Sequence, residues 1–315
     1  MLNLHDIQSA RQRIHGRVKR TPLVTSQALS DRLGAKVYLK LELFQKTGSF
    51  KVRGAFNKVL SLPEDRRGRG LVAVSGGNHA QAVAYAAAQL GLPSVIVMPE
   101  KTPRNYVDAT RGYGAEVVLV PRVQEAFREI AKYENEGWTS VHPFDDPLVM
   151  AGQGTVGIEI VDDLPEVTDV LVSIGGGGFI GGVATAVKHL KPGVRVWGVE
   201  TEGADAMSQA LAAGHPVQLE AITSIARTLG APSVSQQTLS LAQKYLECVT
   251  LVPDSEAMSS LRLLLERAKI LTEPAASCTW AAAERLRAHF SPSSHVVLVL
   301  CGGNMAVEDL CRYQM

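Results

Sequence analysis

Short apolar runs alternate with longer amphipathic stretches along the chain from about residue 70 onward. The apolar runs are rich in Val, Leu and Ile, which is typical of strands buried on both faces of a sheet. The stretches between them place apolar residues at the spacing of one helix face. The pattern predicts strands at residues 70–75, 93–99, 115–120, 167–174, 194–200 and 295–304, and helices at residues 78–91, 102–114, 124–137, 183–193, 255–270 and 275–290. The second of these helices is expected to be capped by Thr102, with Pro103 at its first position.

Strands that are separated by helices require crossover connections, which are right-handed and set neighbouring strands parallel. We therefore predict an α/β fold with two lobes, built on parallel or mostly parallel sheets flanked by helices. The two lobes are inferred from the number of strand–helix units, because no linker or break in composition divides the chain. We expect a large domain formed by residues 1–68 and 147–315, and a small domain at residues 69–146.

The composition changes this picture little, but it excludes several classes of protein. Hydrophobic residues make up 46% of the 315 residues and charged residues 20%, as in a soluble globular protein. Lys and Arg number 32 against 31 Asp and Glu, without a basic block, which disfavours a nucleic-acid partner. No apolar run reaches the length of a membrane span, and the first residues do not resemble a signal peptide. The four cysteines form no CxxC pair, so we expect a protein of the reducing cytoplasm.

The segment SIGGGGFIGG, from Ser173 to Gly182, lies between a predicted strand and a predicted helix. Consecutive glycines leave backbone N–H groups open to an anion, and the start of a helix adds its dipole. The segment therefore indicates a phosphate site. Gly176, Gly178 and Gly181 also satisfy GxGxxG, and Glu200 ends the next strand where a ribose-binding acid would lie. A nicotinamide-dependent oxidoreductase thus stays open at this point.

A second glycine turn follows the first predicted strand in the segment VSGGNHAQ, residues 74–81. Ser75, Gly76 and Gly77 form an exposed-amide turn suited to a carboxylate, and Asn78 adds an amide side chain. The alternative is an ordinary capped helix start, since Ser and Asn both cap well. Two glycines before Asn78 favour a binding loop.

Two further side chains are candidates for chemistry. Cys301 ends the last predicted strand, where a side chain of a doubly wound sheet points into the ligand crevice. Taken alone, a small buried thiol is the better interpretation of Cys301. Lys51 lies in FQKTGSFKVRGAF, without neighbouring carboxylates and two residues before Arg53. Burial and a second cation would each lower its pKa and free the amine as a nucleophile, whereas a surface lysine at a helix start is the plain alternative.

Five segments taken together resemble a known family. They are KTGSFKVRGA, SGGNHAQ, GGGGFIGG, EPAAS and CGGN, in this order along the chain. The order is similar to that of the serine/threonine dehydratase and serine racemase family, which are pyridoxal-phosphate enzymes of fold type II, the tryptophan-synthase-β-like fold. The resemblance extends from about Thr21 to Asn304 and is specific for the family, but much less so for the substrate.

The resemblance implies a role for each matching residue. Lys51 would hold the cofactor as a Schiff base and act as the general base, and Phe50 would pack against the pyridine ring. Asn78 would bind the ring's 3′-hydroxyl, and Cys301 would face the ring nitrogen. The phosphate would be held by the amides of Gly175, Gly176, Gly177 and Gly178, and the substrate carboxylate by Ser75, Gly76, Gly77, Asn78 and His79.

The activity that the resemblance implies is β-elimination of a 3-hydroxy amino acid, such as L-threonine or L-serine, to a 2-oxo acid and ammonia. A bulkier substrate of the phenylserine or hydroxyaspartate type is an alternative. Serine racemisation is disfavoured, because Gly76 stands where racemases of this group carry a serine. A nicotinamide oxidoreductase is the least favoured enzyme, and the presence of Lys51 argues against a non-catalytic binding protein. Relatives are commonly homodimers.

Two departures from the family pattern affect the expected site. Relatives with a structural divalent cation use a glutamate, a backbone carbonyl and an aspartate. Glu200 and the carbonyl of Ala204 match the first two, but Ala206 stands at the third, which places a Mg²⁺ or Ca²⁺ site in doubt. Arg227 stands where relatives often have an aspartate, and this charge reversal is either a specificity feature or a surface substitution.

Overall fold

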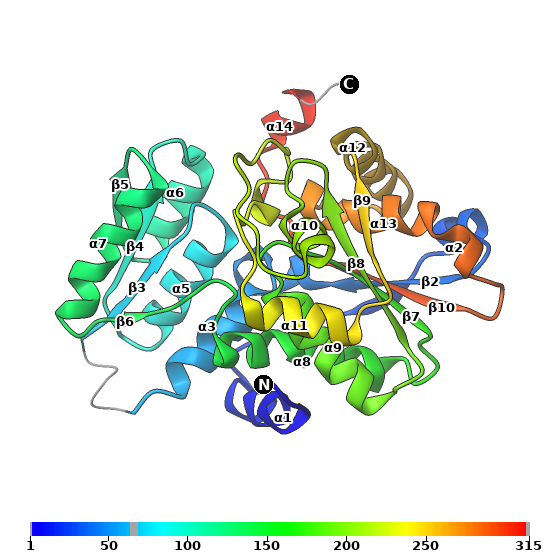
Figure 1. The fold of residues 1–315 in the computed structure, drawn as a ribbon, viewed down its shortest axis with the longest axis horizontal. Coiled ribbons are helices and arrows are strands. Elements are labelled where there is room, and N and C mark those ends of the chain that lie inside the picture. Colours follow the sequence, from blue (N-terminus) through cyan, green and yellow to red (C-terminus); the bar gives the residue numbers. More distant parts are fainter. Residues whose placement is uncertain (1, 64–68, 313–315) are drawn as a thin grey trace.

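The computed structural model describes residues 2–63 and 69–312, which form two sheets with helices on both faces (Figure 1). The larger sheet has six strands in the order β1-β2-β10-β7-β8-β9. Only β1 pairs antiparallel, with β2, and the other pairs are parallel. The strands are β1 (Leu23–Thr25), β2 (Lys36–Leu41), β7 (Asp169–Ser173), β8 (Arg195–Thr201), β9 (Val249–Val252) and β10 (His295–Leu300).

The smaller sheet has four strands, all parallel, in the order β5-β4-β3-β6. Its strands are β3 (Leu71–Val74), β4 (Ser94–Pro99), β5 (Glu116–Val120) and β6 (Thr139–Ser140). Alternate residues of β4 serve opposite faces: Ile96 and Met98 join the core below α5 (Asn78–Gln89), whereas Val97 packs with Ala126 of α7 (Val123–Asn135). The predicted α/β fold with mostly parallel sheets is confirmed.

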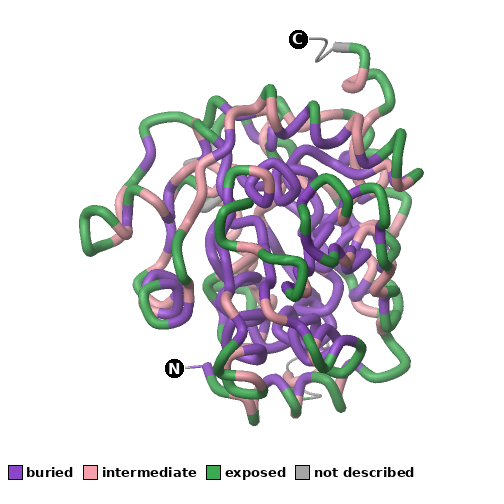
Figure 2. Tube along the Cα trace, turned by 90° about the vertical axis from the view of Figure 1, so that its right-hand side faces the viewer, coloured by how far each residue is buried: buried purple, intermediate pink, exposed green. Residues whose placement is uncertain are grey.

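The remaining helices pack against the two sheets. Buried residues gather at the centre of the molecule, and exposed residues lie at its edge (Figure 2). The described residues form three apolar clusters, one at the larger sheet and two on the opposite faces of the smaller sheet. The larger of these two also includes Val52, Phe56 and Val59. These helices are α1 (Leu4–Arg13), α2 (Gln27–Leu33), α3 (Lys51–Leu60), α6 (Arg104–Gly112), α8 (Pro147–Asp163), α9 (Gly178–Leu190), α10 (Ala206–Ala213), α11 (Gln236–Tyr245), α12 (Asp254–Leu263), α13 (Pro274–Arg285) and α14 (Val307–Arg312).

Helix α8 was not predicted from the pattern, although it lies at the centre of the fold between α3 and α9 (Figure 1). It is buried on nearly all sides, so it lacks the polar face that marks an amphipathic helix. Asp146 caps its start by accepting from the backbone N–H of Leu148 at 2.8 Å. Close packing depends on glycine: a Cβ at Gly152 would lie 2.6 Å from the carbonyl oxygen of Arg53.

The six predicted helices all differ from the structure at one or both ends, and three of these differences are instructive. Helix α6 begins at Arg104 with Pro103 as its N-cap, so the prediction of Thr102 as the cap was wrong. Helix α9 begins five residues before the predicted start at residue 183, because its first turn is built from glycines. The predicted helix at 255–270 is divided in the structure. Its first part is α12, which ends at Leu263, and a π-helical turn, Leu264–Ala268, follows. This turn ends at Lys269, whose φ is +60°.

The predicted domain limits stay a prediction, because the core of the smaller sheet extends into α3. Residues 1, 68 and 315, which limit the predicted large domain, lie outside the described residues. Among residues 2–63 and 69–312, no helix combines the length and the apolar character needed to cross a bilayer.

Candidate active site

The predicted motifs meet where parallel strands of the two sheets end. Strand β10 lies beside β7, so the segments that follow them are neighbours, and Ser173 Oγ lies 3.4 Å from Cys301 Sγ. The backbone N–H of Phe50 donates to the carbonyl of Cys301 at 3.1 Å, which brings the start of α3 to the same place. The smaller sheet contributes Asn78, whose Oδ1 accepts from Asn304 Nδ2 at 2.8 Å. The fold thus joins segments separated by more than 200 residues.

Lys51 is the first residue of α3, and its amine is directed into this meeting point. Nζ donates to the carbonyl oxygen of Pro143 at 2.8 Å and lies 5.2 Å from the centre of the Phe50 ring. Burial lowers the pKa of the amine to about 8, against the opposing influence of Cys301 and Glu273. The interpretation of Lys51 as a plain surface lysine does not hold, because its amine is desolvated.

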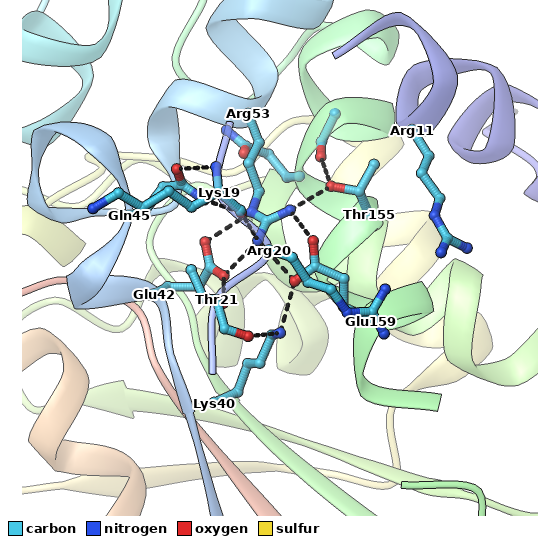
Figure 3. Close-up of polar contacts among 12 residues, drawn as sticks. Arg11, Lys19, Arg20, Thr21, Lys40, Glu42, Gln45, Arg53, Thr155 and Glu159 are labelled. Carbon is cyan, nitrogen blue, oxygen red and sulfur yellow. Dashed lines mark hydrogen bonds and ion pairs between the residues drawn. The ribbon is translucent and has the colours of Figure 1, made fainter. Parts of the chain in front are cut away.

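Arg53 does not act as the second cation that the sequence suggested, because its charge is neutralised. Its guanidinium is fully buried and binds Glu42 at 2.8 Å and Glu159 at 2.7 Å (Figure 3). Lys40 completes the group through a 2.7 Å bond to Glu159. The pKa of Lys51 is shifted by burial, Cys301 and Glu273, and Arg53 does not contribute to this shift. We call Lys40, Glu42, Arg53 and Glu159 the Arg53 cluster.

The glycine segment after β7 forms an open cradle at the start of α9. Gly177 is the N-cap of α9 with φ +87°, a conformation that favours glycine. A Cβ at Gly176 would overlap the Phe144 ring, and one at Gly178 would overlap the Phe144 backbone. At these positions only glycine fits, and the amides that it leaves open suit a phosphate group.

Glu273 is a functional candidate for which the sequence suggested no role, although its EPAAS segment contributed to the resemblance. It is 2% exposed, and its Oε1 accepts from Asn78 Nδ2 and from Thr228 Oγ1, each at 2.9 Å. Its Oε2 is buried without a hydrogen-bond partner in the described part of the chain. Burial raises its pKa to about 7, and the bonds from Thr228 and Asn78 offset this in part.

The turn Ser75–His79 lies beside this carboxyl, at the start of α5. The Ser75 hydroxyl accepts from the N–H of Gly77 at 3.2 Å. His79 Nε2 lies 2.7 Å from the carbonyl oxygen of Val141, and its Nδ1 is buried without a partner among the residues described. Burial, with Lys51 nearby, lowers the pKa of His79 to about 3, so it stays neutral. A carboxylate bound at this turn would therefore accept hydrogen bonds from backbone N–H groups and from the Ser75 hydroxyl.

Cys301 is a buried thiol directly after β10. Its Sγ also lies 3.6 Å from the carbonyl oxygen of Ala275. Burial raises its pKa to about 12, with Glu273 acting in the same direction, so the group is neutral at physiological pH. A neutral thiol matches the role that the resemblance implies for Cys301, next to a pyridine nitrogen that needs no countercharge.

The Glu200 carboxylate is engaged within the protein, and the expected divalent cation is without support among the described residues. Both of its carboxylate oxygens serve the start of α10, accepting from the N–H groups of Met207 and Ser208 at 2.8 Å. The N–H of Ala204, and not its predicted carbonyl, bonds to Thr201, and the described residues contain no group of three metal-ligating side chains. The same contacts give Glu200 a structural role at the start of α10, which the dinucleotide interpretation does not explain.

Arg227 lies in a short 3₁₀ turn, Arg227–Leu229, at one end of the site. It borders a cavity of about 30 Å³ together with Tyr106, Thr228, Glu273 and Asn304. Its neighbour Thr228 reaches the turn Ser75–His79, since a Cβ at Gly77 would lie 3.5 Å from the Thr228 methyl group. Arg227 is thus a residue of the site's rim.

This arrangement fits pyridoxal phosphate, the cofactor of the family that the chain resembles. The glycine cradle would take a phosphate, Lys51 offers a desolvated amine for the aldehyde, and the neutral Cys301 thiol would face the ring. Glu273 Oε2 is buried without a hydrogen-bond partner among the described residues, as is common for a polar atom at a ligand site.

Comparisons with known proteins agree with this geometry. The family model "Pyridoxal-phosphate dependent enzyme" matches residues 14–302. The chain is 43% identical to an L-threonine ammonia-lyase of Geobacter sulfurreducens over 96% of its length and 76% of the relative's. It resembles the structure of maize serine racemase with a TM-score of 0.95 and 32% identity, covering 99% and 96% of the two chains. The structure of a threonine deaminase from T.th. has a TM-score of 0.90 and 40% identity, covering 96% and 99%.

The family match covers most of the chain and accounts for motifs that a dinucleotide site leaves unexplained. The chain therefore belongs to the family of pyridoxal-phosphate-dependent enzymes, fold type II, in the group of serine/threonine dehydratases and serine racemases.

Proposed function

We propose that this enzyme is an ammonia-lyase that converts a 3-hydroxy amino acid, foremost L-threonine and then L-serine, into a 2-oxo acid and ammonia. The observation that carries the proposal is the buried Lys51 amine with a pKa near 8, placed among Asn78, the glycine cradle and Cys301. The threonine ammonia-lyase and threonine deaminase among the similar proteins support threonine as the first substrate to test.

Pyridoxal phosphate would supply an aldehyde for the amino group of the substrate and a ring that withdraws electrons from its Cα–H bond. Lys51 would carry the cofactor as a Schiff base, with Phe50 against the ring. Asn78 would bind the 3′-hydroxyl and Cys301 would face the ring nitrogen. The amides of Gly175, Gly176, Gly177 and Gly178 would hold the phosphate.

Lys51 would also be the general base that takes the Cα proton, once its amine is free. Lowering the pKa from 10.5 to about 8 raises the neutral fraction of the amine about 300-fold near pH 7. The amine therefore accepts protons under ordinary conditions, whereas an exposed lysine is almost fully protonated there. The carboxylate of the substrate would lie against the turn Ser75–His79.

The neutral thiol of Cys301 favours elimination over transamination. An acidic side chain at this position would keep the ring nitrogen protonated and let the ring store more negative charge. A thiol with a pKa near 12 does not do this. Charge that is not held in the ring promotes the departure of the β-hydroxyl group.

Racemisation is the weaker proposal, because the face opposite Lys51 lacks an acid–base group at position 76. The space is also taken: a Cβ at Gly76 would lie 2.6 Å from Thr102 Oγ1. A serine there would require Thr102 to move. The local packing therefore supports a one-base reaction.

A substrate with a second carboxylate, of the hydroxyaspartate type, is the second candidate. Arg227 borders the same small cavity as Thr228 and Glu273, and Thr228 reaches the substrate loop. Asp309 lines this cavity as well, and the proposal is that Arg227 favours an anionic side chain over an aromatic one of the phenylserine type.

The experiment has two parts. Purified protein is mixed with pyridoxal phosphate, and a visible absorption band that borohydride removes is expected. A panel of L-threonine, L-serine, hydroxyaspartate and phenylserine is then scored for 2-oxo acid and ammonia, with threonine expected first. A colourless protein, or one that turns over none of the four, would contradict the proposal. The cytoplasmic location and the homodimer stay predictions.

A further inference from the structure

The turn between β6 and α8, residues 141–146, touches three parts of the candidate site, although the sequence suggested no role for it. The carbonyl of Val141 accepts from His79, and the carbonyl of Pro143 accepts from Lys51 Nζ at 2.8 Å. The Phe144 ring lies against Gly176 in the phosphate cradle. One turn therefore contacts the substrate loop, the amine and the cradle. We call residues 141–146 the linking turn.

The linking turn is shaped by the side chain of His142. Its Nδ1 accepts from the backbone N–H of Asp145 at 2.8 Å and from that of Phe144 at 3.3 Å. Asn and Asp side chains stabilise turns by accepting from N–H groups at the same short separations. Burial lowers the pKa of His142, which favours the neutral ring, and the two bonds from backbone N–H groups place its lone pair at Nδ1. The Phe144 N–H and the Pro143 carbonyl belong to one planar peptide group, so the bond from this N–H to Nδ1 bears on the direction of that carbonyl.

Both ends of the linking turn are anchored elsewhere, so His142 governs its middle. Asp146 caps α8 and forms a 2.7 Å ion pair with Lys58 of α3. The His142 ring also meets the Phe144 ring edge to face, with centres 4.7 Å apart. Two properties of His142, its acceptor nitrogen and its ring, are therefore candidates for a role.

The bond to Pro143 suits a lysine that must wait near a reacting carbon. A neutral amine that donates one N–H to a carbonyl keeps its lone pair directed away from that carbonyl. After the amine takes a proton, the same oxygen accepts from the ammonium group. The carbonyl thus holds the nitrogen in both protonation states and restrains a side chain that is otherwise flexible.

We propose that His142 is a positioning residue: through Nδ1 it holds the Pro143 carbonyl as the resting acceptor for the Lys51 amine whenever that amine is not bonded to the cofactor. The inference rests on the proposed function. It assigns the effect to the acceptor nitrogen and not to the packing of the ring.

Two substitutions separate these properties. His142→Phe keeps a planar ring against Phe144 but has no acceptor, whereas His142→Asn loses the ring and keeps an acceptor at turn distance. For His142→Phe we expect kcat with L-threonine to fall about tenfold, with KM changed less than about twofold. The rate at which cofactor-stripped protein develops the visible band with pyridoxal phosphate should fall by a similar factor. His142→Asn should stay within about threefold of the parent in both rates.

The outcomes distinguish this inference from the proposed function. If the parent protein forms no band and no 2-oxo acid, the proposed function fails and the inference with it. If the parent is active, the inference alone is wrong when His142→Phe keeps both rates. It is equally wrong when His142→Asn is as slow as His142→Phe, or when KM changes as much as kcat. Circular dichroism and thermal unfolding check the fold, and His142→Ala replaces His142→Phe if the latter does not fold.

Discussion

Lys51 and Arg53 lie two residues apart in α3, yet they end in opposite electrostatic environments. Arg53 is fully buried, and Lys51 is half-buried with an amine whose pKa burial lowers. The guanidinium of Arg53 donates hydrogen bonds to two glutamates and to a threonine hydroxyl (Figure 3). Among the described residues, the Lys51 amine donates to the neutral carbonyl of Pro143 and to no carboxylate. The difference separates a structural charge from a reactive amine.

Complete pairing keeps the Arg53 cluster charged despite its burial. Burial alone would raise the pKa of Glu159, but Arg53 and Lys40 outweigh it and lower that pKa. The pKa of Arg53 is raised for the corresponding reason, because Glu42 and Glu159 favour its charged form. The cluster connects β2, α3 and α8. Removing one of its charged side chains would leave another charge buried without a partner, which is strongly destabilising.

Incomplete pairing does the reverse around Lys51. Burial moves the pKa of Lys51 down and that of Glu273 up, each toward its neutral form. Ser49 Oγ, His79 Nδ1 and Glu273 Oε2 are buried without partners among the residues that the structure describes. Buried groups with shifted pKa values and unused polar atoms are typical of ligand and catalytic sites.

The largest expected effect tests the reactive side of this comparison. Lys51→Ala should remove the visible band and lower kcat by more than about 10⁴-fold, over about 5 kcal/mol, since both the Schiff base and the general base are lost. Absorbance and a 2-oxo acid assay measure this, with the exposed Lys101→Ala as the control. A Lys51→Ala enzyme that keeps the parental rate would show that the base has been wrongly assigned.

The next effect tests the paired side. Arg53→Met should lower the free energy of unfolding by about 3–5 kcal/mol, because Glu42 and Glu159 would be left buried without their cation. Urea unfolding followed by circular dichroism measures this. The matched control is Arg285→Met, which breaks the exposed pair with Glu256 and should cost less than about 1 kcal/mol. Equal losses of unfolding free energy in both variants would mean that the buried pairs of Arg53 stabilise the fold no more than the exposed pair of Arg285.

The pH dependence of stability isolates Glu273. Since the folded state raises the pKa of this carboxyl from 4.5 to about 7, its stabilising contribution is complete below pH 4.5 and is lost as the pH rises through 7. Glu273→Gln removes that dependence. In cofactor-free protein, the parent should lose about 2–3 kcal/mol more than the variant between pH 5 and pH 8. Parallel pH profiles in urea unfolding would show that Glu273 is charged throughout.

The smallest effect concerns Cys301. Cys301→Asp should slow dehydration about tenfold, or about 1.4 kcal/mol, and increase transamination products, because an acid would protonate the ring nitrogen. Cys301→Ser keeps a neutral group and should stay within about threefold of the parent. Product analysis by mass spectrometry separates the two reactions. The electronic argument does not survive if the aspartate variant has the parental rate and products.

Much of the fold could be predicted because the signals are local. Buried strands such as 167–174 are recognised by their Val, Leu and Ile content, and the glycine cradle is recognised by its four consecutive glycines. Helix α8 could not be found in this way, since it is buried on nearly all sides and has no polar face to set a period. The site residues Lys51, Asn78 and Cys301 were named from motifs, and their roles stay predictions.

What the sequence by itself determined is the order of strands and helices and the identity of the family, because periodicity and motifs need only neighbouring residues. The tertiary structure alone decided which buried charges are paired. Glu273 reaches Asn78 across 195 positions, and Arg53 reaches Glu159 across 106. No local pattern encodes such contacts. Whether a buried cation meets a carboxylate or a carbonyl depends on how distant elements pack, and this choice makes Arg53 structural and Lys51 reactive.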